Sequence, residues 1–246
     1  MKRGRINAYL KFQLGDFLIL RAGLPTLVAV MFGYMLWKQM SGSIDWTTPQ
    51  GQGFALQVFQ TIASVFITIG SFLGVARIVA DDRSNGYFRF LFSKPVSIER
   101  FYAQQWLLYG IGFVAIAGLL GYWFQSATTQ MPVTGLMVVM GLNWILIGGV
   151  GFLLSAAINA DAAVLVFVYV LSTILHTLKD APFSRMWPWL KQLTRVTLPV
   201  HKVDFIRNQL YAGNSMPWMH ATHVIMYGMI AFVLGLVVLR RSSFAR

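Results

Sequence analysis

The sequence predicts an all-α polytopic membrane protein with six transmembrane helices, an N-terminal interfacial helix and both termini in the cytoplasm. Hydrophobic residues make up 57% of the 246-residue chain and charged residues only 11%. A soluble domain has about 45–50% apolar and about 25% charged residues, so this chain could not coat a water-exposed surface. Six separate segments are apolar over about 20 residues, the length that an α-helix needs to cross a bilayer.

The six predicted spans lie at residues 17–37, 54–79, 101–124, 133–158, 162–178 and 221–239. The fourth and fifth cannot form one helix, because at about 1.5 Å per residue they would far exceed the bilayer thickness. Asn159, Ala160 and Asp161 supply a polar turn between them, so we expect a tight hairpin there. The whole chain, 1–246, is expected to form a single transmembrane domain.

Residues 5–16 have the pattern of a short helix that lies in the membrane interface. Apolar side chains recur there at helical spacing, and the residues between them are basic or polar. The apolar run that follows is longer than the core of a secretory signal and has no small-x-small cleavage site, so we expect it to be retained. Arg21, one turn into the first span, is expected to extend back to the lipid headgroups.

The net charge of +12 is explained by membrane orientation. Twelve of the 20 basic residues fall on the side that contains the N-terminus, and seven on the other side. The positive-inside rule therefore places both termini in the cytoplasm, near anionic headgroups. No nucleic-acid partner is needed to explain this charge.

The outer loop, 179–220, is the longest stretch outside the predicted spans and is shorter than an independent domain. It is rich in Trp and Tyr, and Val203, Ile206 and Leu210 suggest a short amphipathic helix. Anchoring of aromatic residues at the membrane surface explains this composition. A gate over an exit path is the alternative.

The chain lacks the residues that membrane enzymes and ion-coupled carriers need. The central parts of the predicted spans contain no Asp, Glu, Lys or Arg, and the sequence has no cysteine and no phosphate-binding loop. His220 and His223 have a spacing that could place both on one metal ion, but no His-Glu-x-x-His pattern accompanies them. We interpret them as an interfacial polar pair, and His176 as a hydrogen-bonded packing residue. No catalytic residue, metal or cofactor is expected on this chain.

A polar stripe follows one face of the second span. Its residues recur at steps of four and three, which places them above one another on a helix: they are Gln57, Thr61, Ser64, Thr68 and Ser71. The stripe could serve helix packing, since hydroxyls hydrogen-bond across helix contacts. Alternatively it lines a translocation path, whose mild polarity would suit an amphipathic or lipid-like cargo.

The loop 80–100 between the second and third spans has the most specific pattern in the sequence. Gly86 can end a helix in a left-handed conformation, and 87–92 form a short apolar segment. Lys94-Pro95 ends this segment, and Ser97 is a suitable N-cap for the next helix. Such an apolar patch at a membrane face usually meets a partner or the lipid.

This loop resembles the coupling loop of type-2 ATP-binding-cassette (ABC) exporter permeases. The residues that match the family pattern are Asp82, Arg83, Gly86, Leu91, Ser93, Pro95, Val96 and Ser97, with Phe88 in the apolar run. The family usually has Glu at the acidic position, and commonly an acidic residue where Arg89 stands here. The chain length, the six predicted spans, the interfacial helix and the long outer segment also resemble this family.

The resemblance implies a permease subunit without enzymatic activity, in the cytoplasmic (inner) membrane of a bacterium. Its coupling helix would dock on a separate ATPase subunit, which binds the ATP and Mg²⁺, and a second identical or related permease chain would complete the membrane part. An alternative is a non-transporting membrane subunit of the same fold, which transmits ATPase-driven motion to an extracytoplasmic partner.

Overall fold

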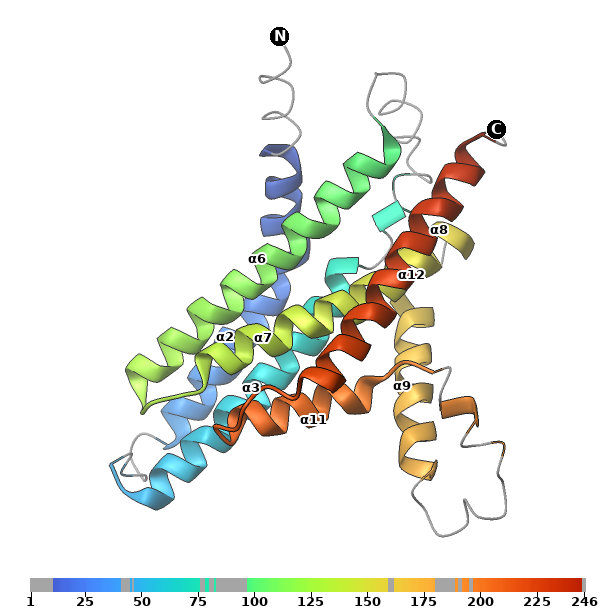
Figure 1. Cartoon of the computed structure of the whole chain (residues 1–246). Coiled ribbons are helices and arrows are strands. Elements are labelled where there is room, and N and C mark those ends of the chain that lie inside the picture. The colour runs from blue at the N-terminus through green and yellow to red at the C-terminus, as the bar shows by residue number, and fades with distance from the viewer. Residues whose placement is uncertain are drawn as a thin grey trace. The chain divides into compact units, whose positions relative to one another are not determined.

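The computed structural model is helical, with no strand among the residues that it describes (Figure 1). These residues are 11–40, 45, 47–75, 78, 79, 82, 97–158, 162–179, 189, 192–194 and 197–244. Among them, five helical segments are long and apolar enough to cross a membrane: Lys11–Lys38, Pro49–Val75, Ile98–Ala127, Val133–Ile158 and Trp218–Arg241. The prediction of an all-α, multi-pass membrane protein is thus confirmed.

The predicted fifth span forms helix α9 (Ala162–Lys179), which is shorter than these five segments. At about 1.5 Å per residue, its 18 residues extend over about 27 Å, slightly less than the about 30 Å thickness of the hydrocarbon core. Helix length therefore identifies five crossing segments in the described part of the chain, and the sixth stays a prediction. The hairpin predicted at 159–161 lies outside the described residues.

The chain divides into two compact units. The first unit combines Met1–Gly74 with Phe101–Gly141, and the second combines Val75–Arg100 with Leu142–Arg246. Neither unit is a continuous stretch of sequence, because each contains segments from both halves of the chain.

The first helix is continuous across the predicted boundary between interfacial helix and span. Residues 11–16 are α-helical, Phe17–Ala22 form the π-helical segment η1, and α2 (Gly23–Met40) follows directly. A separate interfacial helix that ends at residue 16 is therefore not found among the described residues. No proline lies between residues 11 and 24, and the helix runs through the π-helical turn without a break.

Helix α3 (Pro49–Val75) begins with local signals for a helix N-terminus. Pro49 occupies the first helical position, where a missing N–H costs nothing. The preceding Thr48 hydroxyl oxygen accepts a hydrogen bond from the Gly51 N–H at 3.1 Å, the arrangement of an N-cap. Asp45 accepts hydrogen bonds from the N–H and the hydroxyl of Thr47 at 2.9 and 2.6 Å, and these bonds hold the pKa of Asp45 below its usual value.

The core of the first unit is aromatic. Phe113 of α6 (Ile98–Ala127) contacts Phe17 and Phe66, with ring centroids 5.0 and 6.2 Å away. Phe59 and Phe124 form a further pair at 5.7 Å. Glycines make room for these rings: a Cβ at position 70 would lie 3.1 Å from the Phe113 ring. Aromatic packing of this kind joins the first helix, α3 and α6.

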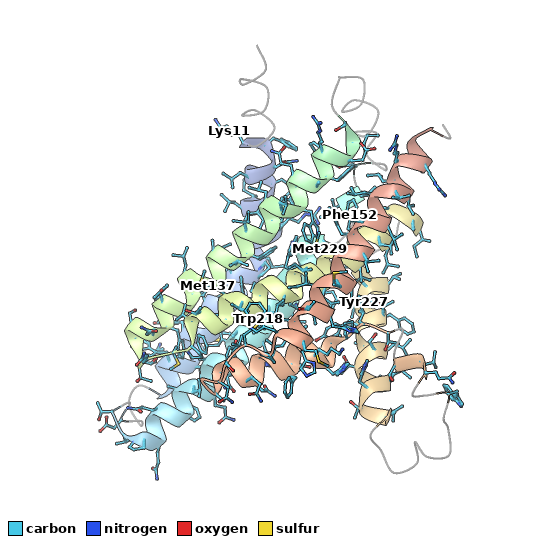
Figure 2. The ribbon with its side chains drawn as sticks, in the orientation of Figure 1. Lys11, Met137, Phe152, Trp218, Tyr227 and Met229 are labelled. Atoms are coloured by element: carbon cyan, nitrogen blue, oxygen red, sulfur yellow. The ribbon has the colours of Figure 1, made fainter. Side chains whose placement is uncertain are left out.

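The second unit is built around α12 (Trp218–Phe244), which packs against η2 (Trp144–Gly148) and α8 (Gly149–Ile158). The backbones approach closely where Gly149 meets Gly228, since a Cβ on Gly149 would overlap the Gly228 carbonyl oxygen. Phe152, labelled in Figure 2, is fully buried and faces Phe232 at 5.0 Å. Close approach at small residues is the usual way in which helices associate within a bilayer.

Helix α11 (Val200–Tyr211) is the short amphipathic helix expected in the outer loop. Val203 and Ile206 are buried, while Phe205 and Asn208 are exposed. It contacts both α9 and α12, and Gly213, which has a positive φ, ends the turn that follows it. The loop thus contains a helix that belongs to the second unit.

Candidate functional site

The coupling segment predicted at 80–100 is described only in part. Asp82 is helical and half-buried, and α6 begins directly after Ser97, as expected for an N-cap position. The other residues predicted to contact an ATPase subunit lie outside the described residues: Arg83, Gly86, Phe88, Leu91, Ser93 and Pro95. The structure therefore describes how the segment is attached at its two ends.

The entry to this segment is attached to α8. The buried Val79 N–H donates a hydrogen bond to the Ser155 hydroxyl oxygen at 3.2 Å. Val75, at the end of α3, lies against Gly151, where a Cβ would overlap the valine side chain. A buried hydrogen bond holds Val79 and close packing holds Val75, so a displacement of these two residues requires a displacement of α8 or the loss of both contacts.

The exit from the segment is joined to α12. Glu99, in the first turn of α6, forms an ion pair with Arg240 near the end of α12, with Oε1 and Nε 3.8 Å apart. Both side chains are largely exposed, at 39% and 69%, so the pair contributes little to stability. It nevertheless links the segment's exit to the helix that packs along α8. Sequence reasoning missed this pair, because the two residues are 141 positions apart.

The polar stripe lies on the side of α3 opposite to its aromatic packing face. Gln57 and Thr61 are exposed, Ser64 and Thr68 are half-buried, and Ser71 is fully buried. At 100° per residue the stripe is centred about half a turn away from Phe59 and Phe66. The stripe is therefore not the surface through which α3 packs against the aromatic side chains of α6.

Hydroxyls of the stripe donate to their own helix. Thr61 Oγ1 donates to the Gln57 carbonyl at 2.9 Å, and Ser64 Oγ donates to the Gln60 carbonyl at 2.8 Å. Such local bonds satisfy a hydroxyl in an apolar environment without a second helix. This arrangement is compatible with a mildly polar lining of a translocation path. It is equally compatible with helix packing, so both interpretations of the stripe stay open.

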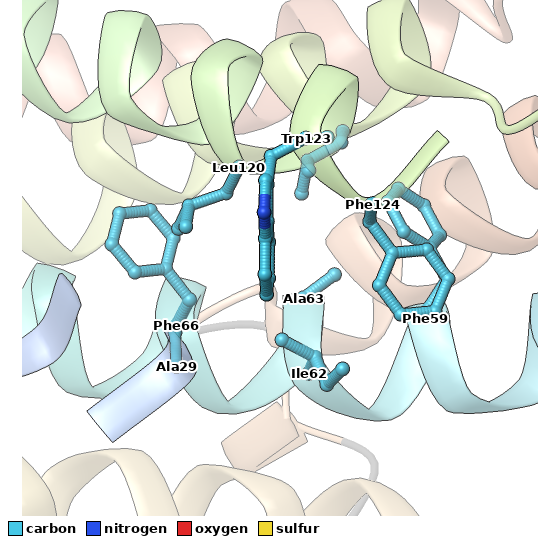
Figure 3. Close-up of a pocket in the computed structure, with 10 residues that line it drawn as sticks. Ala29, Phe59, Ile62, Ala63, Phe66, Leu120, Trp123 and Phe124 are labelled. Atoms are coloured by element: carbon cyan, nitrogen blue, oxygen red, sulfur yellow. The ribbon is translucent and has the colours of Figure 1, made fainter. Parts of the chain in front are cut away.

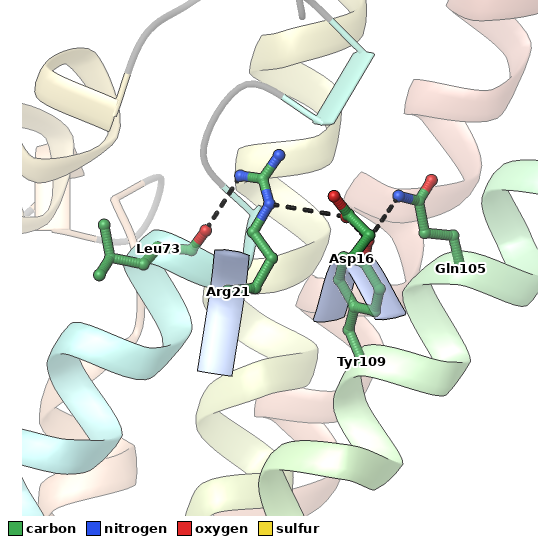
Figure 4. A network of polar contacts seen from close by, with 5 residues as sticks. All are labelled: Asp16, Arg21, Leu73, Gln105 and Tyr109. Carbon is green, nitrogen blue, oxygen red and sulfur yellow. Dashed lines mark hydrogen bonds and ion pairs between the residues drawn. The ribbon is translucent and has the colours of Figure 1, made fainter. Parts of the chain in front are cut away.

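A polar network joins the first helix to α3 and α6 (Figure 4). Tyr109 donates its hydroxyl proton to Asp16 and accepts a hydrogen bond from Gln105 Nε2 at 2.8 Å. Arg21 Nη1 donates to the Leu73 carbonyl at 3.2 Å, and Arg21 Nε lies 4.0 Å from the Asp16 carboxylate. The network contains both signs of charge and is mostly buried, with the Asp16 and Arg21 side chains 20% and 15% exposed.

The position of Arg21 differs from its sequence-based expectation. Its guanidinium group contacts protein acceptors, whereas we expected it to reach the headgroups. The physical reason is that the Leu73 carbonyl oxygen and the Asp16 carboxylate lie within reach of the guanidinium group, which therefore has acceptors inside the protein. The spacing of Gln105 and Tyr109 on one helix face was the available signal for this network.

The four histidines of the chain lie on α9, α11 and α12. His176 is buried, its Nδ1 lies 2.8 Å from the Ser172 carbonyl, and its ring stacks on His201 at 4.0 Å. This confirms the expectation of a hydrogen-bonded packing residue. His220 packs edge-on against Phe205 at 4.7 Å. Within the described part of the chain, no group of three or more His, Cys, Asp or Glu residues could hold a metal ion.

No known protein family matches the sequence, and comparisons with curated proteins and with solved structures found no match either.

Proposed function

We propose that this chain is the transmembrane permease subunit of an ABC exporter, which moves a cargo across the membrane with energy from ATP hydrolysed by a separate nucleotide-binding subunit. The observation that supports this function best is the way the coupling segment is attached. A partner that pushes on a loop can move membrane helices only if the loop is connected to them. Here the entry is bonded to α8 through Val79 and Ser155, and the exit to α12 through Glu99 and Arg240.

Within the second unit, α12 offers a route for such a movement. Arg240 at one end of this helix pairs with Glu99, and the other end packs against α11. The crossing at Gly149 and Gly228 leaves no space between the backbones of α8 and α12, so the two helices move together. A displacement at the coupling segment would thus reach α11 through a pair of tightly packed helices.

The working transporter in this proposal contains two permease chains and two ATPase subunits in a bacterial cytoplasmic membrane. All ATP and Mg²⁺ chemistry belongs to the ATPase subunits, and this chain is not an enzyme. In this proposal α9 is the sixth span, so both termini lie on the same side of the membrane, and the positive-inside rule assigns that side to the cytoplasm. The stripe from Gln57 to Ser71 lines the path in this scheme, and its mild polarity suits an amphipathic or lipid-like cargo.

Charge placed in the apolar part of the coupling segment tests the proposal. Phe88→Asp or Leu91→Asp should abolish docking of the ATPase subunit, because a carboxylate would have to be buried in the partner's groove without a counter-charge. The measurement is the yield of ATPase subunit that co-purifies with the tagged chain from native membranes. Ser215→Asp, at an exposed position after α11, is the control and should leave the yield unchanged. An unchanged yield with Phe88→Asp and Leu91→Asp would contradict the proposal.

The second candidate is a non-transporting subunit that transmits ATPase-driven motion to an extracytoplasmic partner. It is favoured by the contact between α11 and the same helix, α12, that pairs with the coupling segment. Vesicles that contain the chain and its ATPase separate the two candidates. ATP-dependent accumulation of cargo supports the exporter, whereas ATP hydrolysis without any cargo movement supports the second candidate.

A further inference from the structure

An aromatic groove opens on the surface of the first unit between α2 and α6. Its volume is about 170 Å³, comparable with the about 150 Å³ of an apolar cavity that takes up benzene. Six residues line it: Gly33, Tyr34, Trp37, Trp123, Phe124 and Ala127. Gly33 and Ala127 leave the space that larger side chains would fill, and the aromatic rings form the walls.

The groove is open at the outer surface of the helices, and the aromatic rings that line it are partly exposed. Tyr34, Trp37 and Trp123 are 51%, 41% and 42% exposed, although each has a large apolar ring. The groove lies near the ends of two membrane-crossing segments, Lys11–Lys38 and Ile98–Ala127. Aromatic residues are enriched at this depth, where the hydrocarbon meets the headgroups. The molecules that surround such a groove in a membrane are lipids.

A small cavity continues the groove toward the middle of the helices. It has a volume of about 20 Å³ and is lined only by apolar residues, among them Ala29 and Leu120. These two residues lie about one helical turn deeper than Gly33 and Phe124, respectively. Figure 3 shows the Trp123 indole projecting from α6 toward α3, with Phe66 on one side and Phe59 on the other. Trp123 and Phe124 line both the groove and the small cavity.

A positively charged residue, Lys38, lies four residues beyond the groove residue Tyr34, about one turn further along the same face of α2. Lys38 directly follows Trp37 in the last turn of α2 and its side chain is exposed. From Lys38 inward, the residues change from a cation through the aromatic rings of the groove to the apolar lining of the small cavity. A phospholipid changes in the same order, from phosphate through the ester region to the acyl chain.

From this match we infer that the groove is a binding site for one phospholipid of the surrounding bilayer, with its phosphate beside Lys38 and one acyl chain between α2 and α6. The chain end would point toward Ala29 and Leu120. This site is distinct from the stripe of α3 and from the coupling segment, and it does not depend on the proposed function.

Photolabelling tests the site. The probe is phosphatidylglycerol with a diazirine near the end of one acyl chain, in phosphatidylethanolamine vesicles that contain the full chain. We expect labels concentrated on the peptides that contain residues 29–37 and 120–127. Ala127→Leu should reduce this labelling several-fold, because the added side chain fills the groove. Ala115→Leu, the same change at another exposed position of α6, should not alter it.

Lys38→Glu provides a second variant, at an exposed position, and should also lower the labelling several-fold by repelling the phosphate. Labelling spread evenly over the lipid-facing helices, or labelling unaffected by Ala127→Leu and Lys38→Glu, would overturn the inference. So would a cross-link between two copies of the chain through a photoreactive residue at position 37, since it would assign the groove to a second copy.

Discussion

Single residues determine how closely the helices of each unit approach. The contact between Gly149 and Gly228 brings backbone against backbone, and Gly112 leaves room for the ring of Phe17. By contrast, Gly15 and Gly53 have no neighbour close to the position of an added Cβ. The same substitution, glycine to alanine, can therefore be compared at a tightly packed position and at an open one.

Gly149→Ala should destabilise the second unit by about 1–3 kcal/mol, because the new methyl group overlaps the Gly228 carbonyl and forces the helices apart. The measurement is the midpoint of thermal unfolding in detergent. Gly53→Ala is the matched control and should leave the midpoint unchanged or raise it slightly, because alanine favours the helix. Equal midpoints for the two variants would contradict the close crossing.

Arg21→Ala should destabilise the first unit, because it leaves the Leu73 carbonyl without its donor and the Asp16 carboxylate without its nearby cation. Loss of a partner from a buried polar group costs about 1–3 kcal/mol. The measurement is the fall in the midpoint of thermal unfolding in detergent. The control is Arg241→Ala, at an exposed position of α12, which should lower the midpoint less. If the unfolding midpoint falls equally in both variants, the buried network does not stabilise the first unit.

At the scale of elements, the two attachments of the coupling segment differ in kind. The contact with α8 is buried and packed, whereas the ion pair with α12 is exposed. Exposed pairs contribute about 0–1 kcal/mol. A large loss of activity when the Glu99–Arg240 pair is broken would therefore reflect lost transmission of movement and not lost stability.

Arg240→Glu should lower ATP-dependent activity of the complex several-fold with little change in the unfolding midpoint. Like charges at Glu99 and position 240 would push the exit of the segment away from α12. The double variant Glu99→Arg with Arg240→Glu restores an attractive pair and should restore the activity. If the double variant is as impaired as the single one, the pair does not transmit the movement.

The start of α3 gives a pH-dependent prediction. Hydrogen bonds from Thr47 depress the pKa of Asp45, so its contribution to folding is present above the unfolded-state pKa and is lost as the pH falls through the lower folded-state value. Thr47→Val removes the hydroxyl donor and should raise the pKa of Asp45 toward its usual value. An NMR titration of the Asp45 carboxyl carbon measures this change. An unchanged pKa would show that the backbone N–H of Thr47 alone causes the shift.

Hydropathy predicted the elements well because the bilayer imposes one length and one composition on every span. The segment 133–158 matches the helix Val133–Ile158 at both ends. Other helices extend beyond the apolar run, as α3 does by beginning at Pro49, since caps and polar flanks are not part of a hydropathy signal. For the Asp16–Arg21–Tyr109 network the sequence offers only the spacing of Gln105 and Tyr109 on one helix face, because the other contacts depend on which helices become neighbours. The π-helical segments η1 and η2 could not be predicted for the same reason.

For the whole molecule, we propose that the chain obtains its energy from an ATPase partner through the segment between α3 and α6. The most direct test is to isolate the tagged chain from its native membrane and identify the proteins bound to it. We expect a stoichiometric partner whose sequence contains a phosphate-binding loop, together with a second permease chain. A chain that is isolated alone, or only with partners that bind no nucleotide, would contradict the claim.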